Sequence, residues 1–207
     1  YSDIGYLCLE MVCESVDKPL ANAWRNLPGH SEQTLHYRPV AIEGDTRHVA
    51  ATERCSWRKR LIQGQVHDDN CWTMGGIAGH AGLFGRLLDV HHLAQQWLNA
   101  VHGRTNTLGL DRELIQRVID PRQMHQNGTR VLGWDTPSPG ASSAGRHFGR
   151  RSIGHLGFTG TSLWIDSDAE VIVTLLTNRV CPSRDDTRIR ALRPEIHNLV
   201  RTSLGAT

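Results

Sequence analysis

The amino-acid sequence predicts an α+β fold, in which helices come first, an antiparallel sheet follows late in the chain and a terminal helix packs back on that sheet. Apolar residues recur at helical spacing near the amino terminus and again around residues 90–101. Between residues 153 and 177 the pattern changes to short apolar runs that turn residues separate, as in antiparallel strands. These runs are not interleaved with helices, which argues against alternating βαβ units.

Helices are expected over five segments. The first starts with Ser2 or Asp3 as its N-cap and ends at the Lys18-Pro19 step, because a residue before proline is pushed out of the helical region. Its apolar face includes Cys8, which we expect to be a buried, reduced thiol. The other helices cover residues 20–24, 89–101, 111–119 and 185–204. The apolar stripe of the first helix consists of Ile4, Leu7, Cys8, Met11, Val12 and Val16.

Strands are expected at residues 130–134, 153–158, 162–165 and 170–177, and a hairpin at 166–169 joins the last two. Residues 27–72 show little periodicity, and so long an irregular stretch in a compact domain is often functional. Residues 75–85 hold five glycines around His80, which indicates a tight loop that depends on glycine. We expect one domain over residues 1–207, with a mainly helical and loop part at 1–125 and a strand-rich part at 126–207.

The composition excludes several classes of partner. Lys and Arg outnumber Asp and Glu only 23 to 21, which gives a net charge of +2 and no reason to expect nucleic acid or an anionic membrane surface. No apolar run approaches the roughly 20 residues of a membrane span. The five cysteines are scattered and include no Cys-x-x-Cys pair, so neither a disulfide framework nor a zinc site is expected.

Three stretches indicate chemistry when they are taken together. Tyr1-Ser2-Asp3 opens a predicted helix, and His155-Leu156-Gly157 with Phe158-Thr159-Gly160 belongs to a predicted strand and the residues after it. Between them lie Val66-His67-Asp68-Asp69-Asn70 and the glycine-rich loop around His80. In this order the stretches resemble the second motif, the third motif and a loop of the penicillin-recognising serine hydrolases, the family of class C β-lactamases, D-Ala-D-Ala peptidases and related esterases.

The resemblance implies a β-lactamase/transpeptidase-like fold and a serine hydrolase that acts through an acyl-enzyme on an ester, a β-lactam or a D-amino-acid peptide. It implies a small-molecule or peptide substrate and no cofactor. Many relatives act in the bacterial cell envelope, so the resemblance points to the periplasm. A histidine in the third motif occurs in several kinds of relative, so it does not choose among the substrates.

The resemblance implies catalytic roles for Tyr1 and His155. In the family, neighbouring cations lower the pKa of the tyrosine phenol, which then moves protons between the serine and the leaving group. His155, in place of a lysine, would supply that positive influence and orient Tyr1. Gly154 and Gly157 favour the close approach of a ligand to the strand. The alternatives are an exposed terminal tyrosine without a role and a structural histidine on a sheet face.

The substrate-binding residues implied by the resemblance are Asp3, Gly157, Phe158 and Thr159. Asp3 would bond the lysine of the first motif and the substrate amide, or simply cap the helix. The backbone N–H of Phe158 would be one of two oxyanion donors.

His67 and Asp68 are expected to tie the long loop to the rim of the active site, and His80 is expected to fill a turn. A metal site at these three residues is not expected, because their neighbours are loop glycines rather than a spacing that fixes ligands on one face.

The first motif of the family, Ser-x-x-Lys, precedes the tyrosine motif and supplies the nucleophile. This chain opens at Tyr1 without Met, so we expect it to be a piece of a longer protein and inactive until that motif is supplied. Two such strings, Ser15-Val16-Asp17-Lys18 and Ser56-Trp57-Arg58-Lys59, follow Tyr1 and violate the family order. We expect neither serine to be the nucleophile.

Two other hypotheses stay open. A catalytically inactive, penicillin-binding-like protein would use the same cleft to hold a peptidoglycan-like ligand or a partner. A purely structural module would carry these motifs by chance.

Overall fold

The computed structural model describes residues 1–16, 19–27, 35–37, 46, 48–120 and 128–205. The chain divides into two compact units. The first comprises Tyr1–Asp89 with Val180–Arg184, and the second comprises Val90–Arg179 with Asp185–Thr207. The expected single domain, with its two parts at 1–125 and 126–207, stays a prediction.

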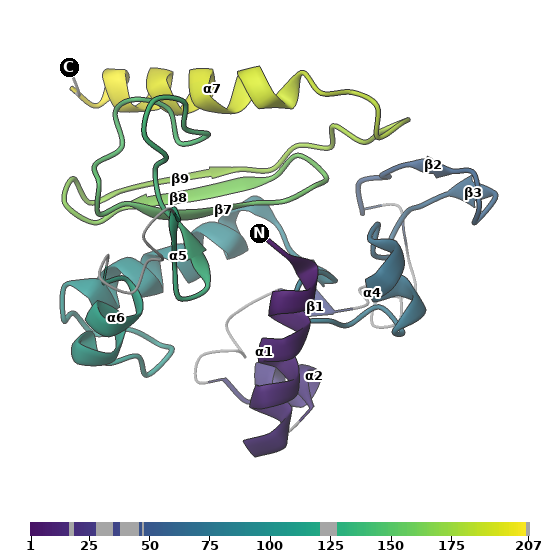
Figure 1. Cartoon of the computed structure of the whole chain (residues 1–207), viewed down its shortest axis with the longest axis horizontal. Helices are drawn as coiled ribbons and strands as arrows, with labels where there is room; N and C mark the ends of the chain where they lie inside the picture. Colours follow the sequence, from purple (N-terminus) through teal and green to yellow (C-terminus); the bar gives the residue numbers. More distant parts are fainter. Residues whose placement is uncertain (17–18, 28–34, 38–45, 47, 121–127, 206–207) are drawn as a thin grey trace. The chain divides into compact units, whose positions relative to one another are not determined.

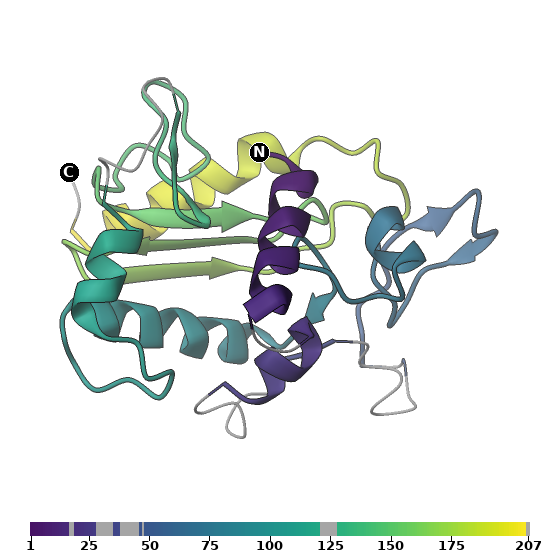
Figure 2. The same cartoon turned by 60° about the horizontal axis from the view of Figure 1, so that its bottom comes forward.

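The second unit is built on a five-stranded antiparallel sheet (Figures 1 and 2). This late sheet confirms the α+β class. The expected strand at 130–134 is instead a hairpin, because Gly133 at φ +77° turns the chain between β5 and β6. The strands lie in the order β5 (Arg130–Val131), β6 (Trp134–Asp135), β7 (Ile153–Leu156), β8 (Ser162–Asp166) and β9 (Val171–Leu175).

Helices cover both faces of this sheet. Figure 1 shows α5 (Leu87–Val101) and α7 (Ile189–Ser203) on opposite sides of it, and α6 (Arg112–Val118) starts at the expected N-cap, Asp111. Side chains alternate along β8, so Ile165 packs in the core with α5 and α6 while Trp164 packs on the other face. The α5 core contains Ala94, Leu98, Ala100, Val101, Ile115, Ile119, Val131, Ile153 and Ile165. The opposite core contains Ala144, Phe148, Trp164 and Val173, with Val200 of α7 against it.

The first unit has short elements around a small core. Residues 28–34, 38–45 and 47 of the stretch expected to be irregular lie outside the described residues. None of the helices among the described residues is long and apolar enough to cross a bilayer. The small core of the first unit consists of Val66, Cys71 and Ala78, with Leu7, Trp72 and Ala81 packed against it. The elements are α1 (Asp3–Val16), α2 (Leu20–Arg25), α4 (Asp69–Thr73), the pair β1 (His36–Tyr37) and β4 (Leu83–Phe84), and the hairpin of β2 (Arg54–Cys55) with β3 (Arg60–Leu61).

The apolar stripe of α1 is mostly exposed, and the expectation that Cys8 is buried is wrong. The glycine-rich loop packs against the Tyr6–Glu10 side of the helix instead. The amide N–H of Gly79 donates to Oε2 of Glu10 over 2.8 Å. A Cβ on Gly79 would lie 2.8 Å from the carbonyl oxygen of Tyr6, so only glycine permits this approach.

Candidate active site

The Tyr1 phenol and the Asp3 carboxylate form a hydrogen-bonded pair at the start of α1. Asp3 is the first residue of the helix, where the helix dipole stabilises a negative charge. The ring of Tyr6 lies 5.6 Å from the ring of Tyr1, between centroids. The structure therefore brings together two of the residues that the sequence motif selects.

The pKa of the Tyr1 phenol lies above its ordinary value. Partial burial is the largest cause, and the hydrogen bond to Asp3 and the negative charges of Asp3 and Asp68 add to it. The charged groups that raise the pKa of the phenol are carboxylates, and the lowered pKa implied by the resemblance stays a prediction for the protein with its Ser-x-x-Lys segment. The phenol is protonated at neutral pH.

Asp68 and His80 form a second pair in the same unit. Oδ1 of Asp68 accepts the amide N–H of Cys71 over 2.7 Å, which caps α4, and lies 2.9 Å from Nε2 of His80. Burial acts to raise the pKa of Asp68, but these hydrogen bonds hold it below its usual range. Nδ1 of His80 is buried without a hydrogen-bond partner, which favours the neutral tautomer with its proton on Nε2.

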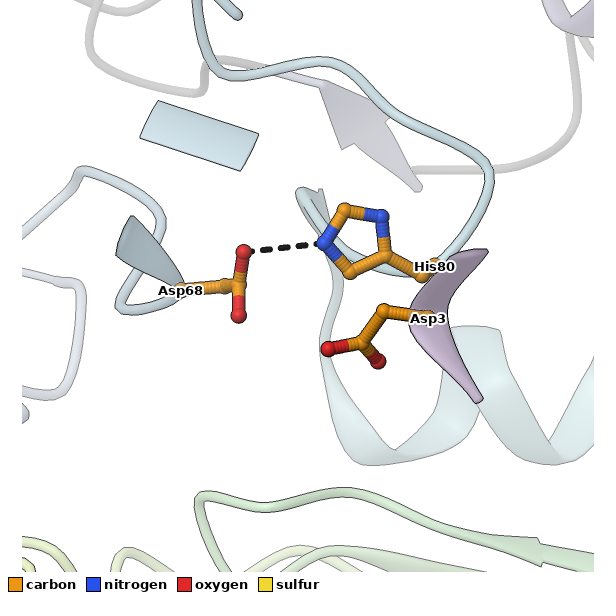
Figure 3. A group of neighbouring side chains, drawn as sticks. All are labelled: Asp3, Asp68 and His80. Carbon is orange, nitrogen blue, oxygen red and sulfur yellow. Dashed lines mark hydrogen bonds and ion pairs between the residues drawn. The ribbon is translucent and has the colours of Figure 1, made fainter. Parts of the chain in front are cut away.

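Asp3 lies beside this pair, and the three side chains form the Asp3–Asp68–His80 cluster (Figure 3). One potential ligand atom from each lies within 4.8 Å of the other two. Two features argue against a metal here. Oδ1 of Asp68 already takes part in two hydrogen bonds, and Nδ1 of His80 lacks the second-shell partner that metal-bound histidines normally have. The cluster is better described as a hydrogen-bonded acidic site.

The structure does not bring His67 into this cluster. Its Nε2 lies 2.8 Å from Oε2 of Glu53, and both side chains are largely buried. Glu53 also accepts three hydrogen bonds from the guanidinium of Arg184, at 2.7–3.0 Å. Arg184 first, and then His67, hold the pKa of Glu53 at about 2 against the opposing effect of burial. His67 therefore anchors the loop to Glu53, and a rim role for it stays a prediction.

His155 lies half-buried on β7 of the second unit. Its Nδ1 lies 3.0 Å from the carbonyl oxygen of Leu156, so Nδ1 carries the proton, and its Nε2 lies 3.5 Å from the guanidinium of Arg130. Burial, with a further contribution from Arg130, lowers the pKa of His155. The lowered pKa does not favour a charged imidazole, and the positive influence expected of His155 stays a prediction; the guanidinium of Arg130 lies beside its Nε2.

The chain turns tightly after β7, through Gly157, Phe158 and Thr159. The amide N–H of Gly157 donates to the carbonyl oxygen of Thr161 over 2.8 Å. Arg193 of α7 donates to the carbonyl oxygens of both Gly157 (2.6 Å) and Thr161 (2.7 Å). This arginine closes the turn from inside the unit.

Arg179 holds the same turn at its exposed end. Its guanidinium lies 4.3 Å from the centroid of the Phe158 ring, and its Nε donates to the Phe158 carbonyl over 2.8 Å. Its backbone N–H donates to the carbonyl oxygen of Thr159 over 2.8 Å. A rigid turn is what an oxyanion donor requires, but the role of the Phe158 N–H stays a prediction.

The glycines beside His155 make room for the protein's own side chains. A Cβ on Gly154 would lie 2.3 Å from the ring of Trp164, and one on Gly157 would lie 2.1 Å from Oγ1 of Thr161. The interpretation that these glycines admit a ligand is therefore not needed, because packing within the sheet and the turn already requires them.

The serines of the two misplaced Ser-x-x-Lys strings are both exposed. Ser15 is exposed and donates to the carbonyl oxygen of Val12 over 2.7 Å, and Lys18 lies outside the described residues. Ser56 is exposed in the turn between β2 and β3, where Lys59 takes a φ of +52°.

A third serine does lie against a histidine, but inside the core. Oγ of Ser162 is 3.1 Å from Nε2 of His197, and Nδ1 of His197 is 2.8 Å from the carbonyl oxygen of Ser143. This order resembles a nucleophile, a base and an orienting group. Ser162 is only 3% exposed and His197 is 0% exposed, so the pair satisfies buried polar groups rather than meeting a substrate.

A family model described as Beta-lactamase matches residues 1–197. The chain belongs to the Beta-lactamase family. It is 31% identical over 205 residues to an N-acetylmuramyl-L-alanine amidase of Bacillus subtilis, covering 86% of this chain and 44% of the relative. It is 29% identical over 205 residues to a putative D-alanyl-D-alanine carboxypeptidase of Salmonella typhi, covering 86% of this chain and 45% of the relative.

Solved structures give the same fold for this Beta-lactamase family member. Unliganded simvastatin synthase (LovD) from Aspergillus terreus matches with a TM-score of 0.61 at 14% identity, over 94% of this chain and 52% of that one. At such low identity the match shows the fold alone, and it confirms the β-lactamase/transpeptidase-like α+β class. The chain spans less than half the length of the curated relatives it matches.

Sequence reasoning missed His80 and Arg130 as neighbours of the motif residues. His80 had one usable signal, a single histidine among five closely spaced glycines. Arg130 had none, because the pairing of β5 and β6 with β7 brings it to His155 across 25 residues of sequence.

Proposed function

We propose that the intact protein is a metal-independent serine hydrolase that forms an acyl-enzyme and hydrolyses it with water. The observation that carries the proposal is the hydrogen-bonded Tyr1–Asp3 pair at the start of α1, in a chain that matches the Beta-lactamase family from residue 1 to 197. The nucleophile would come from a Ser-x-x-Lys segment upstream of Tyr1.

The charges around Tyr1 support a specific role for that segment. Asp3 and Asp68 place negative charge beside the phenol, and these carboxylates would attract the ammonium of the Ser-x-x-Lys lysine. An ammonium at this position would lower the pKa of the phenol toward the physiological range. The phenol would then relay a proton from the serine to the leaving group, and the Phe158 N–H would stabilise the oxyanion.

The curated relatives favour one substrate class. Both are named as enzymes of cell-wall chemistry, an N-acetylmuramyl-L-alanine amidase and a putative D-alanyl-D-alanine carboxypeptidase. Because the second of these names specifies D-alanine, we favour a D-amino-acid peptide of peptidoglycan over a small ester or a β-lactam. Such a substrate would place the reaction in the bacterial periplasm.

The test is acyl-enzyme formation by the protein expressed with its upstream region. It is mixed with a D-Ala-D-Ala peptide, a chromogenic ester and a chromogenic β-lactam, and both turnover and intact mass are followed. A mass increase on an upstream serine with release of D-Ala supports the proposal. Absence of adduct and turnover with all three probes contradicts it.

A catalytically inactive binding protein is the second candidate. It is favoured by one feature of the site: burial and the carboxylates of Asp3 and Asp68 raise the pKa of the Tyr1 phenol, so the phenol by itself is not a base at neutral pH. This candidate predicts that penicillin binds reversibly in calorimetry, without any change in the protein's mass.

A further inference from the structure

The guanidinium of Arg58 is buried beside two tryptophan rings. Its side chain is 1% exposed, and its Cζ lies 5.4 Å from the ring centroid of Trp57 and 4.8 Å from that of Trp72. The two rings also contact each other edge to face, with centroids 5.2 Å apart. Cation–π contacts with neighbouring rings stabilise a buried guanidinium.

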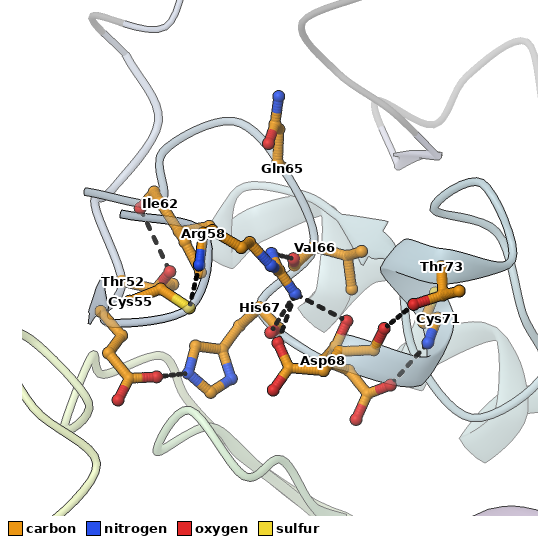
Figure 4. A network of polar contacts seen from close by, with 12 residues as sticks. Thr52, Cys55, Arg58, Ile62, Gln65, Val66, His67, Asp68, Cys71 and Thr73 are labelled. Carbon is orange, nitrogen blue, oxygen red and sulfur yellow. Dashed lines mark hydrogen bonds and ion pairs between the residues drawn. The ribbon is translucent and has the colours of Figure 1, made fainter. Parts of the chain in front are cut away.

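This guanidinium holds a continuous backbone segment, residues 66–69 (Figure 4). Nη1 donates to the carbonyl oxygen of Val66 over 2.8 Å, and Nη2 lies 3.0 Å from the carbonyl oxygen of His67 and 3.2 Å from that of Asp68. Nη2 also lies 2.6 Å from Oδ1 of Asp69. Three successive carbonyl oxygens thus converge on one planar group, which the point charge of a lysine does not reproduce.

The 66–69 segment leads directly to the candidate site. Its third residue, Asp68, caps α4 and bonds His80, and its carboxylate lies within the Asp3–Asp68–His80 cluster. A carboxylate on a loop keeps one position only if its backbone is fixed. In this loop the backbone is fixed by Arg58.

We propose that Arg58 is a positioning residue of the candidate active site, which fixes the 66–69 backbone so that Asp68, paired with His80, stays beside Asp3 and the Tyr1 phenol. The expected effect of Arg58 on turnover rests on the proposed function. The positioning of Asp68 and His80 by Arg58 does not depend on that function.

A purely structural role makes a different prediction. A buried ion pair that only stabilises a fold is commonly replaced by apolar groups of similar size without loss. The bonds of Arg58 go to the segment that carries Asp68 rather than to a distant element. Loss of this arginine should therefore disturb the cluster specifically, even in a variant that remains folded.

The first readout is nuclear magnetic resonance of this chain with ¹⁵N-labelled histidine and ¹³C-labelled tyrosine. In Arg58→Lys and Arg58→Met we expect the imidazole nitrogen shifts of His80 to move toward those of a mixture of tautomers, as Asp68 leaves it. We expect the Tyr1 phenol to titrate at lower pH as the Asp68 carboxylate moves away. The matched control is Arg60→Met, which removes an exposed arginine of the same hairpin whose Nη2 donates to Oε1 of Gln65.

The second readout is turnover by the protein expressed with its upstream region. We expect kcat to fall by about ten- to a hundredfold in Arg58→Lys with KM changed much less, because misplaced catalytic groups act on the transition state. If Arg58→Met does not fold, Asp69→Asn, which removes the negative charge opposite Nη2 of Arg58, should move the His80 nitrogen shifts in the same direction but by less.

The proposal is overturned if folded Arg58→Lys keeps the His80 and Tyr1 signals of the parent chain. Measuring turnover distinguishes failure of the positioning proposal from failure of the proposed function. Altered signals in an unreactive protein would retain the positioning role and remove the hydrolase, whereas unaltered signals in an active protein would remove only the positioning role.

Discussion

Nε2 of His80 lies 2.9 Å from Oδ1 of Asp68, and that same oxygen accepts the amide N–H of Cys71 in the first turn of α4. One carboxylate therefore caps a helix and orients a buried imidazole. The pair joins α4 to the glycine-rich loop, which Gly79 and Glu10 fasten to α1. Through these contacts the loop that sequence reasoning treated as a turn becomes part of the candidate active site.

Asp68→Ala should destabilise the first unit by about 2–3 kcal/mol, because it removes an N-cap worth about 1 kcal/mol and the charged partner of His80. The matched control is Asp111→Ala, which removes only the N-cap bond to Leu114 in α6. That change should cost about 1 kcal/mol. Urea unfolding, with hydrogen exchange of the α4 and α6 amides, measures the loss of stability in both variants. Equal losses of stability would show that the bond from Asp68 to His80 adds nothing.

Tyr1→Phe should lower kcat/KM of the protein with its upstream region by more than about tenfold, since the relay of a proton through the phenol is lost. Tyr37→Phe is the control, because Tyr37 lies in the same unit and burial raises its phenol pKa to about 12. It should leave turnover within about twofold of the parent. Unchanged hydrolysis in Tyr1→Phe would remove Tyr1 from the mechanism.

Glu53 should make the first unit sensitive to acid. Its folded pKa of about 2 lies below its ordinary value of 4.5, so its stabilisation is complete above pH 4.5 and is lost as the pH falls to 2. The shift corresponds to up to about 3 kcal/mol. Arg184→Gln should remove most of this pH dependence in urea unfolding. Arg188→Gln, which breaks an exposed pair with Asp186, should preserve it.

His197 should make the second unit sensitive to mild acid. Burial lowers its folded pKa, so the neutral form contributes stability that is present above the ordinary value of about 6.5 and is lost as the pH falls below it. His197→Gln should flatten the decline in unfolding free energy between about pH 7 and 5. His155 has a shift of the same sign, so His155→Gln measures its separate share. A slope that neither variant reduces would contradict the assignment.

The regular elements followed from local patterns. The first helix was predicted to end before Pro19, and α1 extends over Asp3–Val16. Asp111 caps α6 as expected. The turn residues after Asp166 separate β8 from β9, also as expected. Periods of 3.6 and 2 residues depend on neighbours in the sequence, so they are visible without tertiary structure. The β5–β6 hairpin was missed because Gly133 acts within a run that otherwise has strand character.

The side of α1 that faces the protein was predicted wrongly for a different reason. A hydrophobic stripe shows that a helix has a face to cover, but not which part of the polypeptide covers it. In the first unit the contacts of Tyr6 and Glu10 with the glycine-rich loop determine the packed side. Of the predicted stripe, Leu7 packs against the small core of this unit, whereas Ile4 and Met11 are exposed.

The sequence by itself determined the family resemblance, the α+β class and the motif residues Tyr1, Asp3 and His155. Tertiary structure alone decided the neighbours of these residues and the direction of the pKa shifts of Tyr1 and His155, because a pKa and a hydrogen bond depend on groups that are distant in sequence. Asp68 and His80 meet Asp3 across more than sixty residues, and Arg58 holds Asp68 through backbone carbonyl groups that every residue carries. Such contacts leave no pattern in the sequence, since their partners are fixed only when the chain folds.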